Sequence, residues 1–270
     1  MTKKRSVVVA GIASLLAPTV GHVYVGRPFR GIVILGAALL APLVLGHAGA
    51  ARSVGLFYAM QALYLGLFAF LIVDCCLIAR RAVDYRLKPH NRGLVYILVA
   101  AGIYVGLGAL AEFRGSLYGF DSHRIPASSM TPTLSPGDYV ATDTRMAGAG
   151  YVPERGTVVV FEFPRDRSLL YVKRVAGLPG ETIAIVDGVL FIDGAPLPAG
   201  LTTQVSTPDA RSQNFPPTAV PEGAVFVLGD DRGNSYDSRF WGPVPLSHIR
   251  GEVTLIWYSP VPGRTGSEVR

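Results

Sequence analysis

The sequence predicts an N-terminal α-helical membrane region followed by a mainly-β domain, and three observations support this fold class. Apolar runs long enough to cross a bilayer occur before residue 115. Short β-branched runs separated by turn residues follow that point. The charge divides in the same place. Residues 1–120 carry 12 Lys+Arg and 3 Asp+Glu, and residues 121–270 carry 13 and 16, so balances of +9 and −3 give the net charge of +6.

Three apolar runs are expected to span the membrane, at residues 31–45, 53–79 and 94–111. The second and third are long enough to cross roughly 30 Å of hydrocarbon, whereas the first reaches that length only with its flank to residue 49. Together with the segment that precedes them, these runs define a transmembrane helical region at residues 1–115.

A fourth apolar segment, residues 6–25, is interrupted by Pro18, Gly21 and His22. It follows MTKKR and so has the outline of a secretory signal. No small-residue cleavage site precedes the basic turn GRPFR, so we do not expect it to be cleaved. Two alternatives stay open, a fourth kinked span and a re-entrant segment that dips into the membrane and returns.

The basic residues set the expected orientation, because Lys and Arg concentrate in the cytoplasmic loops of membrane proteins. The strongest basic loop follows the second span and consists of Arg80, Arg81, Arg86, Lys88 and Arg92. With that loop in the cytoplasm, the third span leads outwards and residues 121–270 lie outside. The basic residues at positions 3–5 also belong inside, which favours three spans plus a re-entrant segment over four spans.

One acidic residue, Asp74, lies within the second span, where a charge is costly. Either its side chain extends to the inner interface near Arg80 and Arg81, or it packs between spans. The adjacent Cys75 and Cys76 are the only cysteines of the chain. We therefore expect no disulfide framework and no Cys/His metal site, and no cofactor is implied.

Residues 116–262 are predicted to form one extracytoplasmic β-rich domain. Its expected strands are 138–142, 157–163, 169–176, 182–186, 189–192, 225–228 and 253–257. The dipeptide at 187–188, Asp-Gly, predicts a tight hairpin, and the Asp-Gly at 193–194 predicts another turn. Residues 199–222 are expected to be a long surface connection, and residues 263–270 a disordered tail.

Lys173 is the only lysine after Lys88, in a domain that otherwise uses arginine for positive charge. Arginine stays protonated in proteins, whereas burial can keep a lysine amine neutral, and a neutral amine is a general base. The apolar run LLYVKRVAG predicts a strand that carries this amine into a dry site, with Arg174 on the opposite face. Upstream, the Pro-rich loop IPASSMTPTLSPGD contains Ser129, and a serine with a lysine base is a known nucleophile pairing.

Three motifs, IPASSMTPTLSPGD, YVKRVAGLPGE and LGDDRGNSYDSRFWGPVP, follow the apolar segments in this order. Over residues 120–258 the chain resembles bacterial type I signal peptidase, the serine/lysine leader peptidase that removes signal peptides from exported proteins. The resemblance implies a mainly-β catalytic domain of the signal peptidase type on the periplasmic side of the bacterial inner membrane. It also implies signal peptides of exported pre-proteins and the lipid bilayer as partners. The cations between apolar runs form no patch for nucleic acid.

The resemblance gives roles to the residues at matching positions. Ser129 stands where the family has its nucleophile, and Lys173 stands where it has the general base. Ser235 corresponds to a serine whose hydroxyl hydrogen-bonds the lysine amine. Asp237 and Arg239 correspond to a structural ion pair close to the site.

The sequence departs from the family at Ala127, because many members have a hydroxyl two residues before the nucleophile that helps to hold the oxyanion. Ser128 is the nearest replacement, and one lost donor is worth a few kcal/mol of transition-state stabilisation. The substrate is expected to bind as an added β-strand. The family's preference for small residues near the cut implies shallow apolar pockets, for which the candidates are Ile125, Ala127, Leu170 and Val172.

Four further apolar residues have two possible environments. Met130, Leu134, Trp241 and Tyr258 either rest on the lipid surface or pack in the core. Core packing is at least as well supported for the two aromatic residues.

Other functions stay open on the sequence alone. His123 and His248 allow a Ser-His-Asp triad to be written, although neither lies in a triad motif. Self-cleaving repressor-type proteases share a Ser/Lys pair and a related β-fold, but the membrane spans argue against them. In a non-enzyme alternative, the chain is a membrane-anchored β-domain that binds partners, and Ser129 and Lys173 are merely structural.

Overall fold

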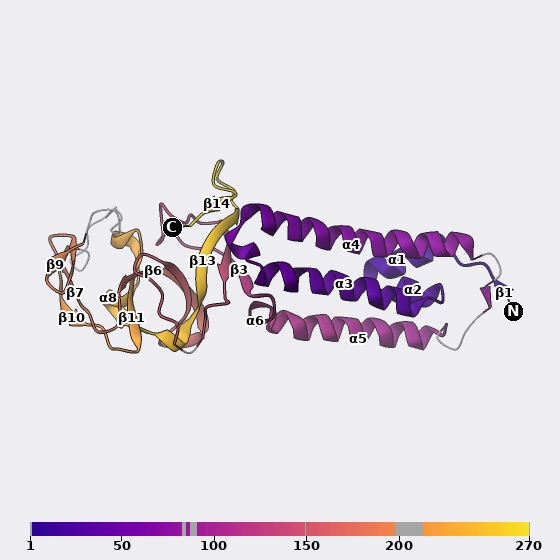
Figure 1. The fold of residues 1–270 in the computed structure, drawn as a ribbon, viewed down its shortest axis with the longest axis horizontal. Coiled ribbons are helices and arrows are strands. Elements are labelled where there is room, and N and C mark those ends of the chain that lie inside the picture. The colour runs from indigo at the N-terminus through magenta and orange to yellow at the C-terminus, as the bar shows by residue number, and fades with distance from the viewer. Residues whose placement is uncertain (1, 83–84, 87–90, 149, 198–212, 270) are drawn as a thin grey trace. The chain divides into compact units, whose positions relative to one another are not determined.

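The computed structural model describes residues 2–82, 85–86, 91–148, 150–197 and 213–269. The chain forms two compact units, one of helices and one of strands (Figure 1). The helical unit comprises Met1–Ala50 and Gly55–Gly119, and the β unit comprises Ala51–Val54 and Phe120–Arg270. The predicted fold class, apolar helices followed by a mainly-β domain, is confirmed.

Among its described residues, the helical unit holds three helices of membrane-spanning length. Its elements are β1 (Thr2–Lys3), α1 (Val7–Leu16), α2 (Val20–Tyr24), α3 (Pro28–His47), η1 (Ala50–Arg52), α4 (Val54–Arg81), β2 (Tyr85–Arg86), α5 (Gly93–Glu112) and α6 (Arg114–Tyr118). By length and composition α3, α4 and α5 could each cross a membrane. They occupy the positions of the three expected spans.

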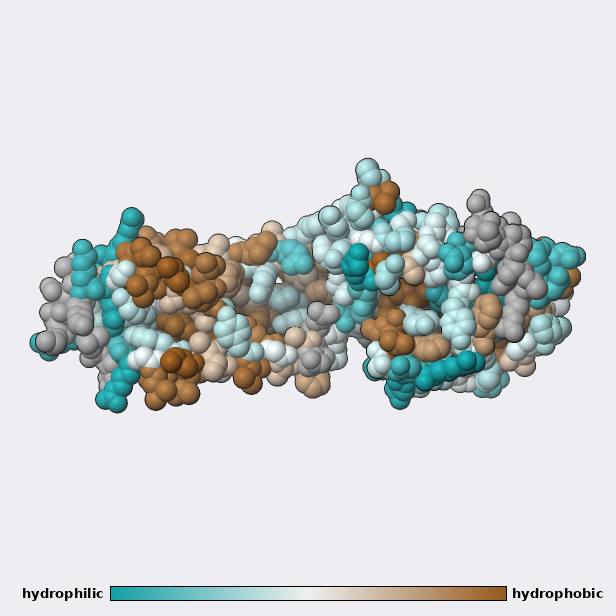
Figure 2. Space-filling model, turned by 180° about the vertical axis from the view of Figure 1, so that it is seen from behind, coloured by the Kyte–Doolittle hydropathy of each residue, from teal (hydrophilic) through white to brown (hydrophobic). Residues whose placement is uncertain are grey.

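The surface of these helices is apolar. In α5 none of the most apolar 18-residue window is buried, and Leu94 and Val105 are 66% and 73% exposed. Hydrophobic side chains cover the middle of the helical unit on the face that Figure 2 shows. A contiguous apolar surface of this kind marks a membrane or protein contact, and helices with all backbone bonds satisfied internally suit the bilayer.

The segment 6–25 forms two short helices rather than one long one. Ser6 caps α1, because its hydroxyl accepts a hydrogen bond from the Val9 N–H at 3.3 Å. α1 has 10 residues, about half the number that crosses the hydrocarbon. Thr19 then takes a left-handed backbone conformation (φ 74°) that separates α1 from α2. Neither short helix is long enough to cross by itself, and both the re-entrant segment and the number of crossings stay predictions.

Asp74 of α4 is buried between helices. Its two carboxylate oxygens accept hydrogen bonds from Nε and Nη2 of Arg30 at 2.7 Å each, and Nε2 of His22 lies 3.1 Å away. The alternative in which this carboxylate extends towards Arg80 and Arg81 is wrong, and packing between spans is confirmed. A buried carboxylate without partners is strongly destabilising, so the bonded arrangement is favoured.

The β unit consists of antiparallel strands in two sheets. The strands are β3 (Phe120–Arg124), β4 (Tyr139–Asp143), β5 (Val158–Phe163), β6 (Asp166–Gly177), β7 (Thr182–Val186), β8 (Val189–Ile192), β9 (Ala195–Pro196), β10 (Phe215–Ala219), β11 (Ala224–Leu228), β12 (Val244–Pro245), β13 (Ile249–Tyr258) and β14 (Ser267–Glu268). The larger sheet has the order β12-β11-β6-β5-β13-β4-β3, with β14 beside β13, and the smaller has the order β10-β7-β8-β9. The described part of the unit also contains the short helical turns η3 (Arg232–Asn234), α8 (Ser238–Trp241) and η4 (Leu246–His248).

Both Asp-Gly dipeptides form turns, as predicted. Asp187 and Gly188 have φ values of 48° and 79° and connect the paired strands β7 and β8. Asp193 and Gly194 have φ values of 50° and 79° and connect β8 to β9. Glycine and aspartate are among the few residues that tolerate this left-handed conformation, which a two-residue hairpin turn requires.

Two expectations about connections need correction. The expected surface connection at 199–222 lies partly outside the described residues, and its described part contains β10, which pairs with β7. The expected disorder of the tail at 263–270 is wrong for residues 263–269, because β14 pairs with β13. Arg264 also donates hydrogen bonds to the carbonyl oxygens of Pro132 and Thr133, at 3.0 and 2.7 Å. These bonds order the tail against the loop that carries Ser129.

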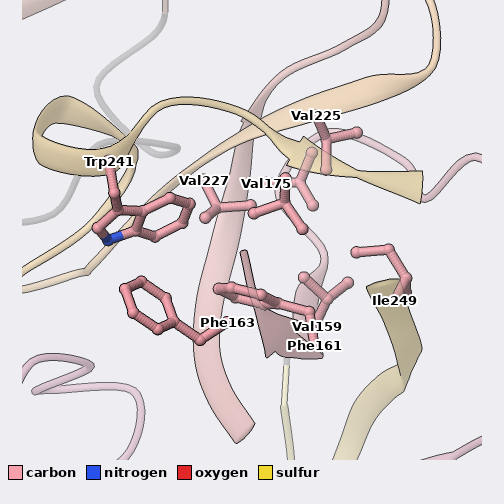
Figure 3. Packing of buried hydrophobic residues seen from close by; sticks show 9 residues of the cluster. Val159, Phe161, Phe163, Val175, Val225, Val227, Trp241 and Ile249 are labelled. Atoms are coloured by element: carbon pink, nitrogen blue, oxygen red, sulfur yellow. The ribbon is translucent and has the colours of Figure 1, made fainter. Parts of the chain in front are cut away.

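Strand β5 supports the core on both of its faces. One cluster, drawn in Figure 3, holds Val159, Phe161 and Phe163 together with Trp241. Alternate residues of the strand point the other way, so Val158 and Val160 pack instead against the loop after β3, with Ile125, Met130 and Leu134. Each fully buried side chain of this size contributes about 1.5–3 kcal/mol. The second cluster therefore fixes the loop on which Ser129 lies.

Candidate active site

Ser129 lies in a turn of the loop between β3 and β4. Its neighbour Met130 is 2% exposed and Leu134 is 0% exposed. Both ends of the loop are joined by backbone hydrogen bonds of 2.8 Å, from the Ile125 N–H to the Asp138 carbonyl and from the Gly137 N–H to the Ile125 carbonyl. Apolar burial and these bonds hold the loop rigidly, which is what a positioned hydroxyl requires.

Lys173 lies within β6 and brings its amine to Ser129. The Nζ atom is 2.8 Å from Ser129 Oγ and 3.0 Å from the carbonyl oxygen of Val172. Lys173 is paired with Val159 across the sheet, so the strand that carries it is held in the interior of the larger sheet. The predicted proximity of hydroxyl and amine is thus observed at hydrogen-bond distance.

The amine of Lys173 is poised to lose its proton near neutral pH. Burial lowers the pKa of Lys173 from 10.5 to about 8, although the carboxylates of Asp237 and Asp230 favour the charged form and act in the opposite direction. The side chain is buried, with the residue 5% exposed, so desolvation outweighs these two charges. A substantial fraction of the amine is then neutral at pH 8, and a neutral amine within reach of a hydroxyl can accept its proton.

Arg174 points away from Lys173, as strand alternation predicts. Its Nε and Nη2 donate to the carboxylate of Asp230 at 2.8 and 2.7 Å. Nη2 also donates to Thr133 Oγ1 at 2.9 Å, in the loop that carries Ser129. This bidentate pair ties that loop to the segment after β11, so it supports the site from the opposite face of β6.

The predicted bond between Ser235 and the lysine amine is not formed. Ser235 lines the same cavity as Lys173 and Ser129, but its buried Oγ has no hydrogen-bond partner among the described atoms. The Lys173 amine instead forms hydrogen bonds with Ser129 Oγ and the Val172 carbonyl oxygen. Ser235 packs against Gly229, where an added Cβ would lie 2.1 Å from Ser235 Oγ and 2.6 Å from the Ser129 carbonyl oxygen. Glycine at 229 is therefore needed for this loop to approach the nucleophile.

Asp237 and Arg239 form a fully buried ion pair beside the site, in agreement with the structural role that the resemblance implies. Arg239 Nε and Nη2 lie 2.8 and 2.9 Å from the Asp237 carboxylate, and both side chains are 0% exposed. Asp237 Oδ2 also accepts the Gly229 N–H at 3.0 Å. Arg239 Nη2 donates to the Arg232 carbonyl at 2.7 Å. The pair thus holds the loop 229–235 at its first residue and at its centre.

Asn234 is a polar residue of the site that sequence reasoning missed. Its Nδ2 donates a hydrogen bond of 2.9 Å to Ser128 Oγ. Ala127, Ser129 and Asn234 line the cavity, and Ser128 does not. The hydroxyl of Ser128 therefore faces Asn234 rather than the reacting centre. The residue stands in the motif LGDDRGNSYDSRFWGPVP, but that motif alone does not reveal where its amide points.

The cavity at the site has a volume of about 860 Å³. All four residues expected to contact the substrate, Ile125, Ala127, Leu170 and Val172, lie on its wall, as do Tyr171, Tyr236 and Phe240. The last three were not predicted, since aromatic residues in this region suit the core equally well. The cavity wall is predominantly apolar and also holds Ser129 and Lys173, as is typical of a ligand-binding site.

Three of the four residues with two possible environments lie in the core. Met130, Leu134 and Trp241 are 2%, 0% and 8% exposed, so contact with lipid is wrong for them. They fill the clusters around β5, where burial is more favourable than an exposed loop position. Tyr258 is 48% exposed and stays available for either environment.

The histidine triad is not assembled in the described part of the chain. The hydroxyl of Ser129 bonds Lys173 and no histidine. His248 Nδ1 lies 3.3 Å from the carbonyl oxygen of Glu162, and His123 Nε2 lies 3.9 Å from a carboxylate oxygen of Asp121. A serine nucleophile needs its base within hydrogen-bond reach, and the lysine fulfils that condition.

Comparison with known proteins gives a consistent result. Residues 95–258 match the family described as signal peptidase, peptidase S26. A probable signal peptidase I of Synechocystis sp. is 35% identical over 50% of this chain and 69% of its own length. Signal peptidase I of Leptolyngbya laminosa is 34% identical over 56% and 75%, and that of Bacillus caldolyticus is 32% identical over 57% and 87%. A crystal structure of a signal peptidase I from Enterococcus faecalis is 35% identical, covering 38% of this chain and 97% of that one, with a TM-score of 0.30.

The family match extends over more than half of the chain and includes all three of the motifs that carry Ser129, Lys173 and Asp237. Several relatives with the same name align over more than two thirds of their own length. The chain therefore belongs to the signal peptidase family, peptidase S26, and is a hydrolase of the signal peptidase class.

Proposed function

We propose that this chain is a membrane-bound serine endopeptidase that cleaves signal peptides from exported pre-proteins, with Ser129 as nucleophile and Lys173 as general base. The observation that carries the mechanism is the 2.8 Å contact between Lys173 Nζ and Ser129 Oγ. Membership of the signal peptidase family supports the reaction and its substrate class. The buried amine supports the Ser/Lys pairing over a histidine base.

In the proposed reaction the neutral amine of Lys173 accepts the hydroxyl proton of Ser129 as Oγ attacks the scissile carbonyl carbon. The resulting ammonium gives that proton to the leaving amine when the C–N bond breaks, which leaves an acyl-enzyme and a neutral Lys173. A water molecule, deprotonated by the same amine, then attacks the acyl carbon. The serine recovers its proton when the ester bond breaks.

Two strand edges lie beside the proposed nucleophile and suit an extended substrate. β3 is the last strand of the larger sheet. On β6, pairing with β11 runs from Arg174 to Gly177, so the described part of β6 before Lys173 keeps one edge without a strand. A peptide that adds to these edges would place alternate side chains into the cavity wall at Ile125, Leu170 and Val172.

The apolar helices support membrane association, and we propose a multi-pass chain. In this arrangement residues 1–115 form the membrane region and residues 116–262 the protease domain on the extracytoplasmic side of a bacterial cytoplasmic membrane. Arg52, in the short connection between α3 and α4, donates hydrogen bonds to Asp143 at 2.5 Å and to Glu252 at 3.0 Å. These contacts within the β unit support a location of that connection on the same side of the membrane as the protease domain. The proposed orientation places both outside the cytoplasm.

The test of this function is cleavage of an exported precursor by the purified full chain in detergent. We expect Ser129→Ala to lower kcat by at least about 10⁴-fold, because no other described hydroxyl is bonded to the base. Ser168→Ala is the matched control, since that hydroxyl is exposed and bonds only Asp166 among the described residues. Undiminished cleavage by Ser129→Ala, with a normally folded protein, would reject Ser129 as the nucleophile. Absence of cleavage by the folded wild-type chain would support the non-catalytic binding module instead.

The activity should depend on pH through Lys173. Because the folded amine has a pKa of about 8, kcat/KM is expected to fall about tenfold per pH unit below pH 8 and to level off above it. Initial rates of precursor cleavage from pH 5.5 to 10 would measure this profile. A rate that stays constant down to pH 6 would show that the base is not an amine with this pKa.

We further propose that the amide of Asn234 replaces the oxyanion donor that is missing at Ala127. Asn234 lines the cavity beside Ser129, and Ser128 does not. In the free enzyme the Asn234 amide donates its 2.9 Å hydrogen bond to Ser128 Oγ. If the amide donated to the oxyanion instead, an N–H donor would lie next to the developing negative charge. The backbone N–H of Ser129 would supply the other donor.

Asn234→Ala is expected to lower kcat about 10²-fold with little change in KM, because an oxyanion donor acts in the transition state. Ser128→Ala is the matched control and removes only the group that the amide bonds in the free enzyme, so we expect less than about a tenfold effect. Steady-state kinetics on one peptide substrate measures both. A larger loss in Ser128→Ala than in Asn234→Ala would assign the oxyanion contact to Ser128.

A further inference from the structure

A second cavity lies within the helical unit, where α3 begins and α4 ends. Its volume is about 890 Å³. Three arginines line it, Arg27, Arg30 and Arg81, together with apolar side chains that include Phe29 and Ile78. The proposed protease reaction uses none of these residues.

The described wall of this cavity carries positive charge. Arg30 is neutralised by its bidentate contact with Asp74. Arg27 and Arg81 have no hydrogen bond or ion pair to any described acidic side chain, and no described acidic residue lines the cavity. Two exposed arginines without a described carboxylate in the same cavity suit an anion with several oxygens, because the guanidinium fork matches phosphate.

The position of the cavity favours a membrane lipid. α3 and α4 are joined by a short connection and run in opposite directions, so the beginning of α3 and the end of α4 lie at the same end of this pair. Both helices are long enough to cross the hydrocarbon, which places their ends at the level of the headgroups. Figure 2 shows hydrophilic side chains gathered at one end of the helical unit, next to the hydrophobic middle.

The wall of the cavity is amphiphilic in the way that a phospholipid requires. Phe29 is 78% exposed beside Arg27 and Arg30, and Ile78 lies one helical turn before Arg81. A soluble oxyanion would gain no binding energy from exposed apolar side chains next to the arginines. A phospholipid pairs its phosphate with arginine and its first acyl carbons with apolar side chains.

We infer that this cavity binds the phosphodiester headgroup of an anionic phospholipid, with Arg27 and Arg81 contacting the phosphate oxygens and Phe29 and Ile78 contacting the acyl chains. Basic pockets between membrane helices on the cytoplasmic side are a recognised form of lipid site. The end of α4 belongs to the basic loop that the sequence places in the cytoplasm. The bound lipid would hold the beginning of α3 and the end of α4 at the inner leaflet. This role would be independent of the protease reaction.

The experiment titrates the delipidated full chain in detergent with phosphatidylglycerol and, separately, with phosphatidylcholine, and counts bound lipid by native mass spectrometry. Arg27→Gln/Arg81→Gln is compared with Arg80→Gln/Arg86→Gln, which removes the same charge from exposed arginines outside the cavity. We expect the first pair to weaken phosphatidylglycerol binding about 30-fold. The control pair should stay within about threefold of the wild type.

Three results would overturn the inference. Equal loss in both double variants would indicate general attraction to the basic loop rather than a site. Equal affinity of the wild type for phosphatidylcholine and phosphatidylglycerol would remove the selectivity for negative charge. Complete displacement of phosphatidylglycerol by millimolar inorganic phosphate would assign the cavity to a soluble oxyanion. The single variants Arg27→Gln and Arg81→Gln, each expected to lose about fivefold, provide the test if the double variant is unstable.

Discussion

Replacement of Lys173 by arginine is expected to abolish precursor cleavage while the protein still folds. Arginine keeps a positive charge but stays protonated, so it cannot accept the proton of Ser129. Lys173→Met removes the charge and the base together with little change in side-chain volume. We expect both variants to lose at least about 10⁴-fold in kcat. Cleavage by Lys173→Arg at more than a hundredth of the wild-type rate would exclude the lysine as general base.

Lys173→Arg and Lys173→Met should differ in their free energy of unfolding. This difference shows whether Lys173 is a buried amine with a lowered pKa or an ordinary lysine. The folded pKa of Lys173 is about 8 and the usual value is 10.5, so between these values the unfolded chain binds more protons and wild-type stability rises with pH. Below pH 8 the buried charge costs up to about 3 kcal/mol. Lys173→Met should therefore be more stable than wild type at pH 7, and the difference should vanish above pH 10.5.

Thermal unfolding of the full chain at pH 7 and at pH 10.5 measures this difference. Lys173→Arg serves as the control, because it retains a buried cation and should be no more stable than wild type at either pH. A Lys173→Met variant that is less stable than wild type at pH 7 would indicate that the amine contributes favourable bonds rather than a desolvated charge.

The ion pair of Asp237 and Arg239 should have the largest effect on folding. Arg239→Met leaves the Asp237 carboxylate buried at 0% exposure without its cation, and loss of one partner of such a pair costs about 3–5 kcal/mol. Activity is expected to fall with it, because Asp237 also holds the Gly229 N–H beside Ser129. Chemical or thermal unfolding measures the loss.

A matched control tests whether the loss of stability comes from the burial of the ion pair or from the loss of any ion pair. Arg250 pairs with Glu162 but is 54% exposed, so Arg250→Met should cost less than about 1 kcal/mol. The double variant Asp237→Leu/Arg239→Met should recover much of the stability lost by Arg239→Met, since a pair of apolar side chains leaves no buried charge. Equal losses in Arg239→Met and Arg250→Met would contradict the structural role of the buried pair.

Local sequence signals predicted the parts of the fold that depend on local chemistry. The Asp-Gly turns and their strands follow from residues that tolerate a left-handed backbone, and the apolar helices follow from composition. Several of the strands that escaped prediction are very short or contain proline. β10 contains two prolines and β12 contains one, and β14 joins β13 through only two residues. No alternating apolar pattern marks such strands, because pairing with a neighbouring strand, rather than their own composition, determines them.

The candidate site shows the same limit. The pairing of Ser129 with Lys173 was predictable, because a unique lysine in an apolar strand stands out against an arginine-rich background. The direction of a side chain in an irregular loop was not. Ser235 was expected to bond the amine and instead packs against Gly229, and Asn234 lines the cavity although its sequence position gives no sign of this. The contact of Asp74 with Arg30 depends on how helices pack, which no single span reveals.

The proton on Lys173 can be observed directly, because the chain contains only the lysines Lys3, Lys4, Lys88 and Lys173. The full chain with isotope-labelled lysine side chains, titrated by NMR from pH 6 to 11, would show one signal that is missing from Lys173→Arg. We expect that signal to titrate at about pH 8. If it titrates near 10.5, the ordinary lysine value, then the amine is not a base at physiological pH and the proposed mechanism is wrong.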